Sequence, residues 1–495
     1  MTPDVATPFP LLSLLLWLPL GGTLLCLLLR HSSNLCRWIS LLTTLTVLVV
    51  ALGMAVSSIG GSGWLFYEDA AWIEPFGIRY TLGMDGISLL LVLLTALLQV
   101  AAILISWRQK QRPALFYALV LVMETGIIGV FLSLDLILFY LFWELMLIPM
   151  FFLIGVWGHE NRVYAAVKFF FFTLAGSLFL LLAIIWLYLL HGGQTGDYSF
   201  ALDALRQTVL TPGQEMILYI GFMLAFIVKV PLFPFHTWLP DAHTEAPPAG
   251  SVDLAGLLLK TGVYGMIRFA FPLFPAAAQK SLPFLAILAL VGIFYAAWIA
   301  YVQTDMKRVI AYSSVAHLGF VILGLAAWNQ LAWEGSLLLM INHGITTGGL
   351  FVMIAMIQDR SGTRELGKLG GLWTVFPNLS AFFLLFCLSS LGLPGLANFA
   401  GEILVLLGAF KADPLWGGMA VAGVVFSAAY MLRVVQSALW GESKKLARND
   451  DLAVREWLIL VPLAALVVLL GVYPAPVLEF LREPVSLLLE TGGMP

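Results

Sequence analysis

The chain has 495 residues, of which 61% are hydrophobic and 11% charged, and its formal net charge is −3. With a mean hydropathy of +0.97, this composition excludes a soluble globular domain and is typical of a polytopic membrane protein. Lysine and arginine are scattered singly or in short groups, so no basic face for nucleic acid is expected.

Apolar runs of roughly 20 residues, separated by short polar loops, predict an all-α protein with about 14 membrane-spanning helices. The first run has neither a basic segment before it nor a cleavage site after it, so we expect it to be retained. The predicted helices are Leu11–Leu29, Leu35–Val56, Leu82–Ser106, Ala114–Leu132, Leu136–Val156, Ala165–Leu190, Gln214–Val230, Ser251–Phe271, Leu282–Val302, Val309–Ala327, Gly335–Ile357, Leu372–Leu391 continuing as Ala400–Phe410, Trp416–Leu439 and Trp457–Val472.

Two of these helices are expected to break inside the membrane, because proline removes a backbone donor and clashes with the preceding turn. The seventh meets Pro231 and Pro234 directly after Lys229, and the twelfth meets LGLPGLANFAG directly before Glu402. Since the breaks lie five helices apart, helices 4–8 and 9–13 are predicted to form two inverted five-helix repeats. The predicted division is 1–112 for helices 1–3, 113–272 and 273–440 for the two repeats, and 441–495 for helix 14 and a tail.

The distribution of basic residues predicts the orientation of the chain in the membrane. Loops after odd-numbered helices hold fourteen lysines and arginines, against five in the even-numbered loops, which include Arg79 and Arg268. The odd loops include Lys307 and the Lys444–Arg448 segment. We therefore expect the odd loops in the cytoplasm and both termini outside.

Three charged residues stand inside apolar sequence, where ionisable groups are costly and usually functional. Glu144 lies in FYLFWELMLIPMF, Lys229 ends the first half of the broken seventh helix, and Lys260 lies in the centre of the eighth, in GLLLKTGVYG. A Glu144–Lys229 pair that can be made and broken would switch the lysine between holding and releasing a proton. The alternatives are charges that only fix helix packing and, for Lys229, a side chain that reaches the interface.

Further titratable residues continue this pattern toward the C-terminus. His317 and His343 fall within predicted helices and could relay protons. A lone histidine on an apolar face is more often a satisfied core residue, but two of them make a relay and a structural role about equally favoured. Glu402, after the second break, could be a terminal proton acceptor or donor, or an interfacial carboxylate. Glu124 and Lys168 are weaker candidates within the membrane.

Other polar residues are expected to be structural. The three cysteines form no CxxC pair or ligand spacing, and no GxGxxG fingerprint after a strand or GxxxxGK(S/T) loop is present. The spacing within FHTWLPDAHTEAPP matches no common metal motif, and its candidate ligands are His236, Asp241, His243 and Glu245. Asp135 and Asp305 lie between spans and are expected to be solvated loop carboxylates.

The sequence resembles the antiporter-like membrane subunits of respiratory complex I over nearly its whole length, most closely the M type. The segments that carry the resemblance are FYLFWELMLIPMFFLIGVWG around Glu144, KVPLFPFHTWLPDAHTEAPPAGSVDLAGLLLKTGVYGMIRF around Lys229 and Lys260, DMKRVIAYSSVAHLGF around His317, INHGITTGGLF around His343 and LPGLANFAGE at Glu402. The resemblance implies a 14-helix fold with two inverted repeats. It also implies that these six residues form a proton path.

The resemblance further implies a translocase subunit of a proton-translocating NADH:quinone oxidoreductase, in an energy-transducing inner membrane. No cofactor or redox centre is expected in this chain, and FMN, iron–sulfur clusters and quinone would lie in partner subunits. L- and N-type subunits would be its neighbours in the bilayer. The alternatives are a subunit of a multi-subunit sodium/proton antiporter or of a membrane hydrogenase, and a structural membrane spacer.

Overall fold

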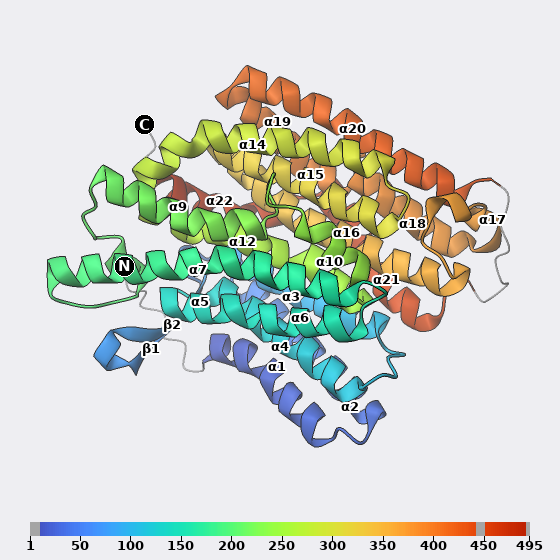
Figure 1. Ribbon diagram of the computed structural model, residues 1–495, viewed down its shortest axis with the longest axis horizontal. Helices are drawn as coiled ribbons and strands as arrows, with labels where there is room; N and C mark the ends of the chain where they lie inside the picture. The colour runs from blue at the N-terminus through green and yellow to red at the C-terminus, as the bar shows by residue number, and fades with distance from the viewer. Residues whose placement is uncertain (1–9, 442–450, 492–495) are drawn as a thin grey trace.

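The computed structural model describes residues 10–441 and 451–491, and most of this chain forms long helices that run side by side (Figure 1). Thirteen stretches in the described part are long and apolar enough to cross a membrane. They are α1 (Leu11–Leu28), α2 (Ser33–Ser57), α3 (Gly86–Ile105), α4 (Pro113–Leu132), α5 with α6 (Leu136–Leu145, Leu147–Trp157), α7 (Arg162–Thr195), α9 (Pro212–Lys229), the stretch Pro248–Leu273, α14 (Pro275–Val302), α15 (Met306–Ala326), α16 (Gln330–Ser361), α20 (Pro414–Leu439) and α21 (Val454–Val472). The predicted all-α polytopic membrane fold is confirmed.

The remaining predicted span is the broken twelfth helix. It consists of α18 (Pro377–Ser390) and α19 (Ala397–Ala412), and residues 391–396 between them are not helical. Each half is shorter than the roughly 20 residues that cross a bilayer, so the two halves make a span only together. Gly392 and Gly395 in the gap have φ of 79° and 89°, a region in which glycine carries no steric penalty.

The seventh helix also breaks where the prolines predict. Its first half, α9, ends at Lys229, and the second half, α10 (Trp238–Glu245), follows a segment of turns that contains Pro231 and Pro234. The lysine therefore ends a helix inside the protein, next to an irregular segment that the surrounding helices must cover.

The eighth span is less regular than expected. It begins as α11 (Pro248–Asp253), then forms a π-helical turn (Leu254–Leu258), then α12 (Leu259–Gly265), a second π turn (Met266–Ala270) and the short α13 (Phe271–Leu273). Such π segments are rare and recur at functional sites. Here the first one ends two residues before Lys260.

A β-hairpin precedes α3, where the sequence analysis expected only loop and helix. Strands β1 (Phe66–Ile73) and β2 (Ile78–Met84) pair antiparallel, and the turn between them (Glu74–Phe76) ends at Gly77, with φ 65°. The predicted start of the third helix at Leu82 is therefore wrong, because Leu82 lies in β2. Asp85 caps the true start of α3 by accepting a hydrogen bond from the Ser88 amide at 2.9 Å.

Arg268, assigned above to an outward loop, instead lies buried inside the eighth span. Its Nη2 donates to the Asp85 Oδ2 at 2.5 Å, and both side chains are buried. The pair joins the second π turn to the start of α3 and removes one residue from the basic count of the even loops. A charge buried in this way depends on its partner.

We expect Arg268→Leu to destabilise the protein by about 3–5 kcal/mol, because it leaves the Asp85 carboxylate buried and unpaired. The double variant Arg268→Leu/Asp85→Asn should recover part of this loss, since asparagine keeps the capping oxygen without the charge. Thermal unfolding in detergent measures both variants. If the double variant is no more stable than Arg268→Leu, the ion pair is not the cause of the loss.

The C-terminal tail is also helical. In the described chain it forms α22 (Ala475–Thr491), which packs against α16 and α3. Shorter elements complete the chain: α8 (Leu202–Leu205), α17 (Leu372–Val375) and a 3-10 turn (Leu366–Lys368). The four predicted domains and the inverted relation of the two repeats stay predictions.

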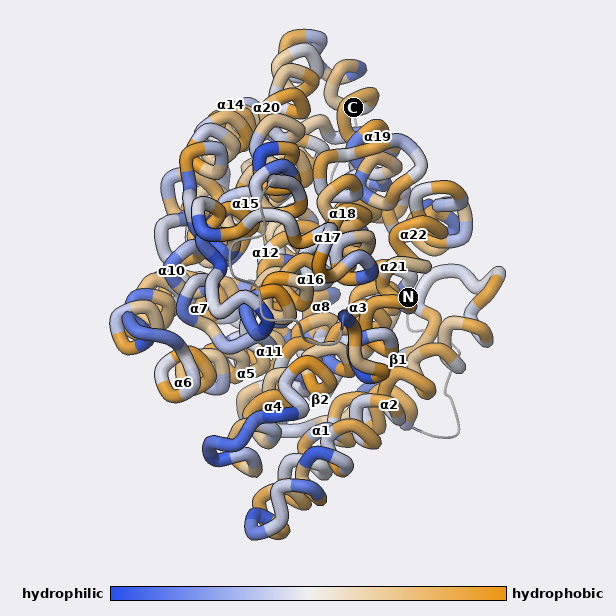
Figure 2. Tube along the Cα trace, turned by 90° about the vertical axis from the view of Figure 1, so that its right-hand side faces the viewer, coloured by the Kyte–Doolittle hydropathy of each residue, from blue (hydrophilic) through white to orange (hydrophobic). Residues whose placement is uncertain are grey.

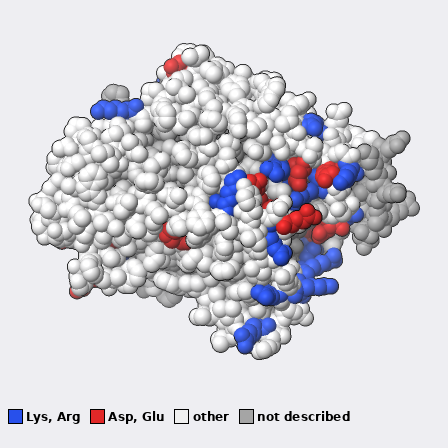
Figure 3. Space-filling view, viewed as in Figure 1, with Lys and Arg blue, Asp and Glu red and all other residues white. Residues whose placement is uncertain are grey.

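Lysine and arginine gather toward one end of the helices, and few lie at the other end on this face (Figure 3). Figure 2 looks onto the end with the α10 and α17 labels, where hydrophilic loops lie over largely hydrophobic helices. We call this end the basic end. The Lys444–Arg448 loop used in the topology prediction lies outside the described residues.

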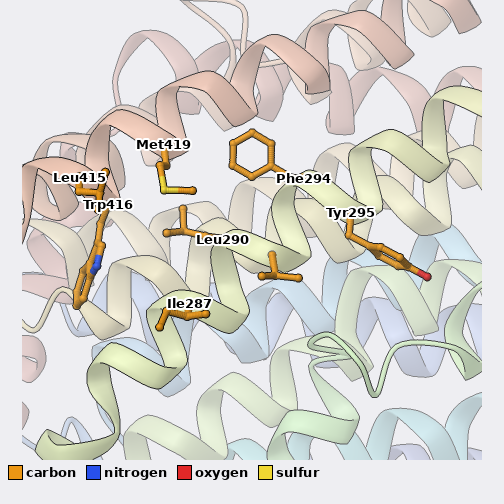
Figure 4. A pocket seen from close by; sticks show the side chains of 8 residues that line it. Ile287, Leu290, Phe294, Tyr295, Leu415, Trp416 and Met419 are labelled. Atoms are coloured by element: carbon orange, nitrogen blue, oxygen red, sulfur yellow. The ribbon is translucent and has the colours of Figure 1, made fainter.

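An apolar groove opens between α14 and α20 (Figure 4). Its volume is about 420 Å³, and it is lined by Ile287, Leu290, Val291, Phe294, Tyr295, Leu415, Trp416 and Met419. No lining side chain carries a charge, so the groove offers nothing for proton or cation chemistry.

Candidate functional site

Lys260 is completely buried in α12, and its Nζ has two polar contacts. It donates to the Ala255 carbonyl at 2.5 Å and lies 2.8 Å from the Nδ1 of His343. A charged lysine can only donate, so His343 must then present a bare Nδ1. A neutral amine would instead accept from a protonated Nδ1. The two nitrogens therefore lie at a distance over which one proton can be exchanged.

His343 extends this contact from α16 toward α15. Its ring centre lies 5.6 Å from that of His317, at an angle of 56°, and both rings are buried. The Nε2 of His343 has no hydrogen-bond partner. Since the rings are not in direct hydrogen-bonding contact, a proton passing between them requires ring movement or a bridging water.

His317 connects this region with Glu402 of α19. Its Nδ1 lies 3.2 Å from the Glu402 Oε1, close enough for an ion pair, although the angle does not meet hydrogen-bond geometry. Its Nε2 lies 3.5 Å from both the Ser390 and the Tyr430 hydroxyls. Glu402 is buried directly after the helix break, and a side chain at Gly392 would collide with its carboxylate.

These contacts join four of the predicted residues into one row, Lys260–His343–His317–Glu402, which we call the central row. The four residues come from α12, α16, α15 and α19. Each member can bind and release a proton, and the row is buried from end to end. Such an arrangement can carry protons across the interior of the helix bundle.

The expected pair of Glu144 and Lys229 is not in direct contact. Among the described residues, neither side chain makes an ion pair within 4.0 Å, and the Lys229 Nζ and Glu144 Oε1 have no hydrogen-bond partner. The Lys229 ammonium instead lies 5.1 Å from the centre of the Trp143 ring, a cation–π distance. The carboxylate is nevertheless near enough to act on the lysine through space. The two side chains are therefore apart, and the switch between them stays a prediction.

Lys168 is not an unpaired intramembrane charge. Its Nζ contacts the Asp241 Oδ2 at 2.7 Å, and Arg308 contacts the other carboxylate oxygen at 3.0 Å. Asp241 is therefore engaged with two cations. The described residues contain no group of three or more histidines, cysteines, aspartates or glutamates that could hold a metal ion.

The prediction of a solvated loop carboxylate is wrong for Asp135, and Asp305 is only partly exposed. Asp135 is fully buried and caps α5, accepting from the Ile137 amide at 2.9 Å. Asp305 caps α15 and also pairs with Arg364 at 2.6 Å. Both lie at helix starts, where a carboxylate satisfies free amides, so their position before an apolar run was the available signal.

Three buried titratable residues were not considered as intramembrane groups. Lys307 was assigned to a loop but is buried, with its Nζ donating to the Ala246 carbonyl at 2.7 Å. His243 is buried and stacks on Phe351 at 4.5 Å. Asp253 is completely buried, and its place inside the predicted eighth span was a signal that the sequence analysis did not use.

Comparisons with known proteins agree with this architecture. Residues 133–427, which include every residue of the central row, match the family described as NADH:quinone oxidoreductase/Mrp antiporter, TM. The chain is 46% identical over 481 residues to NADH-quinone oxidoreductase subunit M of Pseudomonas aeruginosa, covering 94% of each chain. It is 42% identical to the Escherichia coli K12 subunit M, covering 95% of this chain and 96% of that one.

Solved structures give the same result. A chain of respiratory complex I from Thermus thermophilus with bound NADH matches with a TM-score of 0.90 and 33% identity, covering 98% of this chain and 100% of that chain. A chain of the Mrp complex from Dietzia matches with a TM-score of 0.85 at 19% identity, covering 97% of this chain and 98% of that one. The second likeness concerns the fold alone.

Proposed function

Because the chain belongs to the NADH-quinone oxidoreductase subunit M family, we propose that it is a proton-translocating subunit in the membrane arm of an NADH:quinone oxidoreductase. The resemblance found in the sequence is thereby confirmed at the level of the family. The observation that carries the proposal is the central row, in which Lys260 lies 2.8 Å from His343 and His317 lies 3.2 Å from Glu402.

In the proposed mechanism the chain's own residues only bind and pass protons. Lys229 takes up a proton when the Glu144 carboxylate approaches it, and releases the proton when the carboxylate withdraws. Lys260 receives that proton and passes it to the Nδ1 of His343, which leaves a neutral amine behind. His317 takes it next, and Glu402 accepts it at the far end. Quinone reduction in partner subunits would drive the switch by changing the field at Lys229.

Redox chemistry is assigned to the partners. We place FMN, the iron–sulfur clusters and quinone in other subunits of the complex, and we expect L- and N-type subunits beside this chain. The matching family description also names the Mrp antiporter, but the solved Mrp chain is only 19% identical to this one. The subunit M relatives are 42–46% identical over nearly the whole chain. This difference favours the oxidoreductase.

Purification of the complex from its native membrane tests the assignment. Mass spectrometry should identify flavin- and iron–sulfur-containing companion subunits together with this chain, and the purified complex should reduce quinone with NADH. Companions that are only antiporter subunits, with no electron-transfer proteins, would contradict the proposal.

The orientation follows from the basic end, which we place on the cytoplasmic side of an energy-transducing inner membrane. The native cysteines Cys26, Cys36 and Cys387 are buried, so single new cysteines report the topology. A membrane-impermeant reagent should label Glu160→Cys, in the basic-end loop before α7, only from the cytoplasmic side. Gln207→Cys, in the opposite loop after α8, should be labelled only from outside. Reversed labelling of the two variants would show that the orientation is wrong.

A further inference from the structure

Three polar side chains lie together in the apolar interior, away from the central row. They are Gln99 of α3, Glu124 of α4 and Asp253 of α11, and each is 0% exposed. None of their six side-chain oxygen and nitrogen atoms has a hydrogen-bond partner. Helix α3 packs against both α4 and α11, the Gln99 side chain approaches the Asp253 carboxylate, and Asp253 acts on Glu124 through space. We call these three residues the carboxyl cluster.

So many buried polar atoms without hydrogen-bond partners indicate that a ligand binds here. Leaving one buried donor or acceptor without a partner costs about 1–3 kcal/mol, and more for a charged group. Here two carboxyl groups and one amide lack hydrogen-bond partners in the same region, and the three side chains come from three different helices. The cluster therefore needs a further hydrogen-bond partner or bound ion that the side chains alone do not supply.

The charges around the cluster limit what that ligand can be. Two carboxylates that act on each other through space in a low-dielectric interior cannot both be ionised at acceptable cost. No lysine or arginine pairs with either acid among the described ion pairs. Helix α6, which packs against α4 and α11, has no titratable side chain. His343 of α16 contacts Lys260 instead. A proton on one of the two acids reduces their mutual repulsion most simply, since no third acidic or histidine ligand completes a metal site in the described chain.

The position of the cluster connects it to the basic end. Asp253 follows the start of α11 at Pro248 by five residues, Gln99 precedes the end of α3 at Ile105 by six, and Glu124 follows the start of α4 by eleven. At 1.5 Å per residue they lie about 8–17 Å inside that end. Asp253 also precedes Lys260 by seven residues on the same span, or roughly 10 Å along the axis, with the first π turn between them.

We propose that the carboxyl cluster is a second proton-binding site, which holds one exchangeable proton on Glu124 or Asp253 and delivers it to Lys260 from the basic end. The O–H bond of the protonated acid breaks, the neutral amine of Lys260 becomes an ammonium through intervening water, and a proton from the basic end restores the acid. Gln99, whose side chain approaches the Asp253 carboxylate, would orient that acid. The delivery step rests on the proposed function, whereas proton binding at the cluster does not.

Infrared difference spectroscopy of the purified complex tests proton binding directly. The parent should show a protonated-carboxyl C=O band that shifts in D₂O, and this band should be lost in Glu124→Gln and in Asp253→Asn. The matched control Asp203→Asn, at an exposed position in α8, should leave it unchanged. If the acid variants fail to assemble, Gln99→Met, which keeps both acids, should shift the band. A band unchanged in every variant would overturn the proposal.

Two further measurements distinguish proton delivery to Lys260 from proton binding at the cluster, and a bound proton from a bound sodium ion. Proton uptake by vesicles should become slow in Asp253→Asn. In Lys260→Met, the infrared band of the carboxyl cluster should remain unchanged. If Asp253→Asn loses the carboxyl band but takes up protons at the normal rate, delivery to Lys260 is wrong and proton binding at the cluster stands. This holds whatever the outcome for the Lys260 variants. If the carboxyl band appears only when sodium is replaced by potassium, the cluster binds sodium and the proposal of a proton-binding site is wrong.

Discussion

Glu144→Gln is expected to lower proton pumping and the coupled quinone reduction by about tenfold or more, while assembly stays largely intact. Glutamine keeps the shape of the side chain but removes the negative charge that acts on Lys229. Coupling free energies between sites are typically about 1–3 kcal/mol, or roughly 5- to 150-fold, and the whole of this coupling would be lost. Glu144→Asp keeps the charge and should be milder.

Proton uptake and NADH-driven quinone reduction in reconstituted vesicles measure this effect, with subunit content checked by electrophoresis. The matched control is Glu160→Gln, the same replacement at an exposed glutamate before α7, which should behave as the parent. An assembled Glu144→Gln complex that pumps normally would remove the switch and leave Glu144 a packing role.

Much of the fold could be predicted because its signals are local. An apolar run of about 20 residues specifies a span by itself, and the prolines after Lys229 end α9 wherever the other helices lie. The hairpin at 66–84 could not be seen in this way, because its strands are mixed in polarity and the second leads directly into the apolar run of α3. The π turns in the eighth span were also not predicted, because such turns are rare and a continuous apolar run predicts a regular helix.

The members of the candidate site could be predicted, but their contacts could not. A lysine, two histidines and a glutamate in apolar sequence stand out because burial of such groups is costly. Lys260 and His343 are 83 residues apart in the chain, and no sequence rule states that their nitrogens lie 2.8 Å apart. The same limit explains Lys168, whose partner Asp241 lies 73 residues away.

The sequence analysis assigned two buried basic residues to loops for a different reason. Arg268 and Lys307 stand near the ends of apolar runs, so loop positions were the simpler interpretation. Tertiary structure instead buries both, Arg268 against Asp85 and Lys307 against the Ala246 carbonyl. Snorkelling toward water is unnecessary when a partner is available inside the protein.

Lys260→Met should abolish proton translocation through this subunit. Methionine keeps most of the side-chain volume but removes the nitrogen that contacts His343, and no neighbour in GLLLKTGVYG can bind a proton in its place. A packing role predicts the opposite, because an apolar replacement for a buried charge is often neutral or stabilising. Lys260→Arg should also fail although it keeps the charge, since arginine does not release its proton in proteins.

The most direct test of the central row is the number of protons taken up per electron in vesicles that contain the Lys260→Met complex, compared with the parent and with Lys260→Arg. Subunit content and thermal stability should be measured on the same preparations, so that loss of the protein is not mistaken for loss of transport. The row predicts a lower ratio in both variants at unchanged subunit content. If either variant assembles and pumps at the parent ratio, Lys260 is not an obligatory proton carrier and the proposed path fails at its centre.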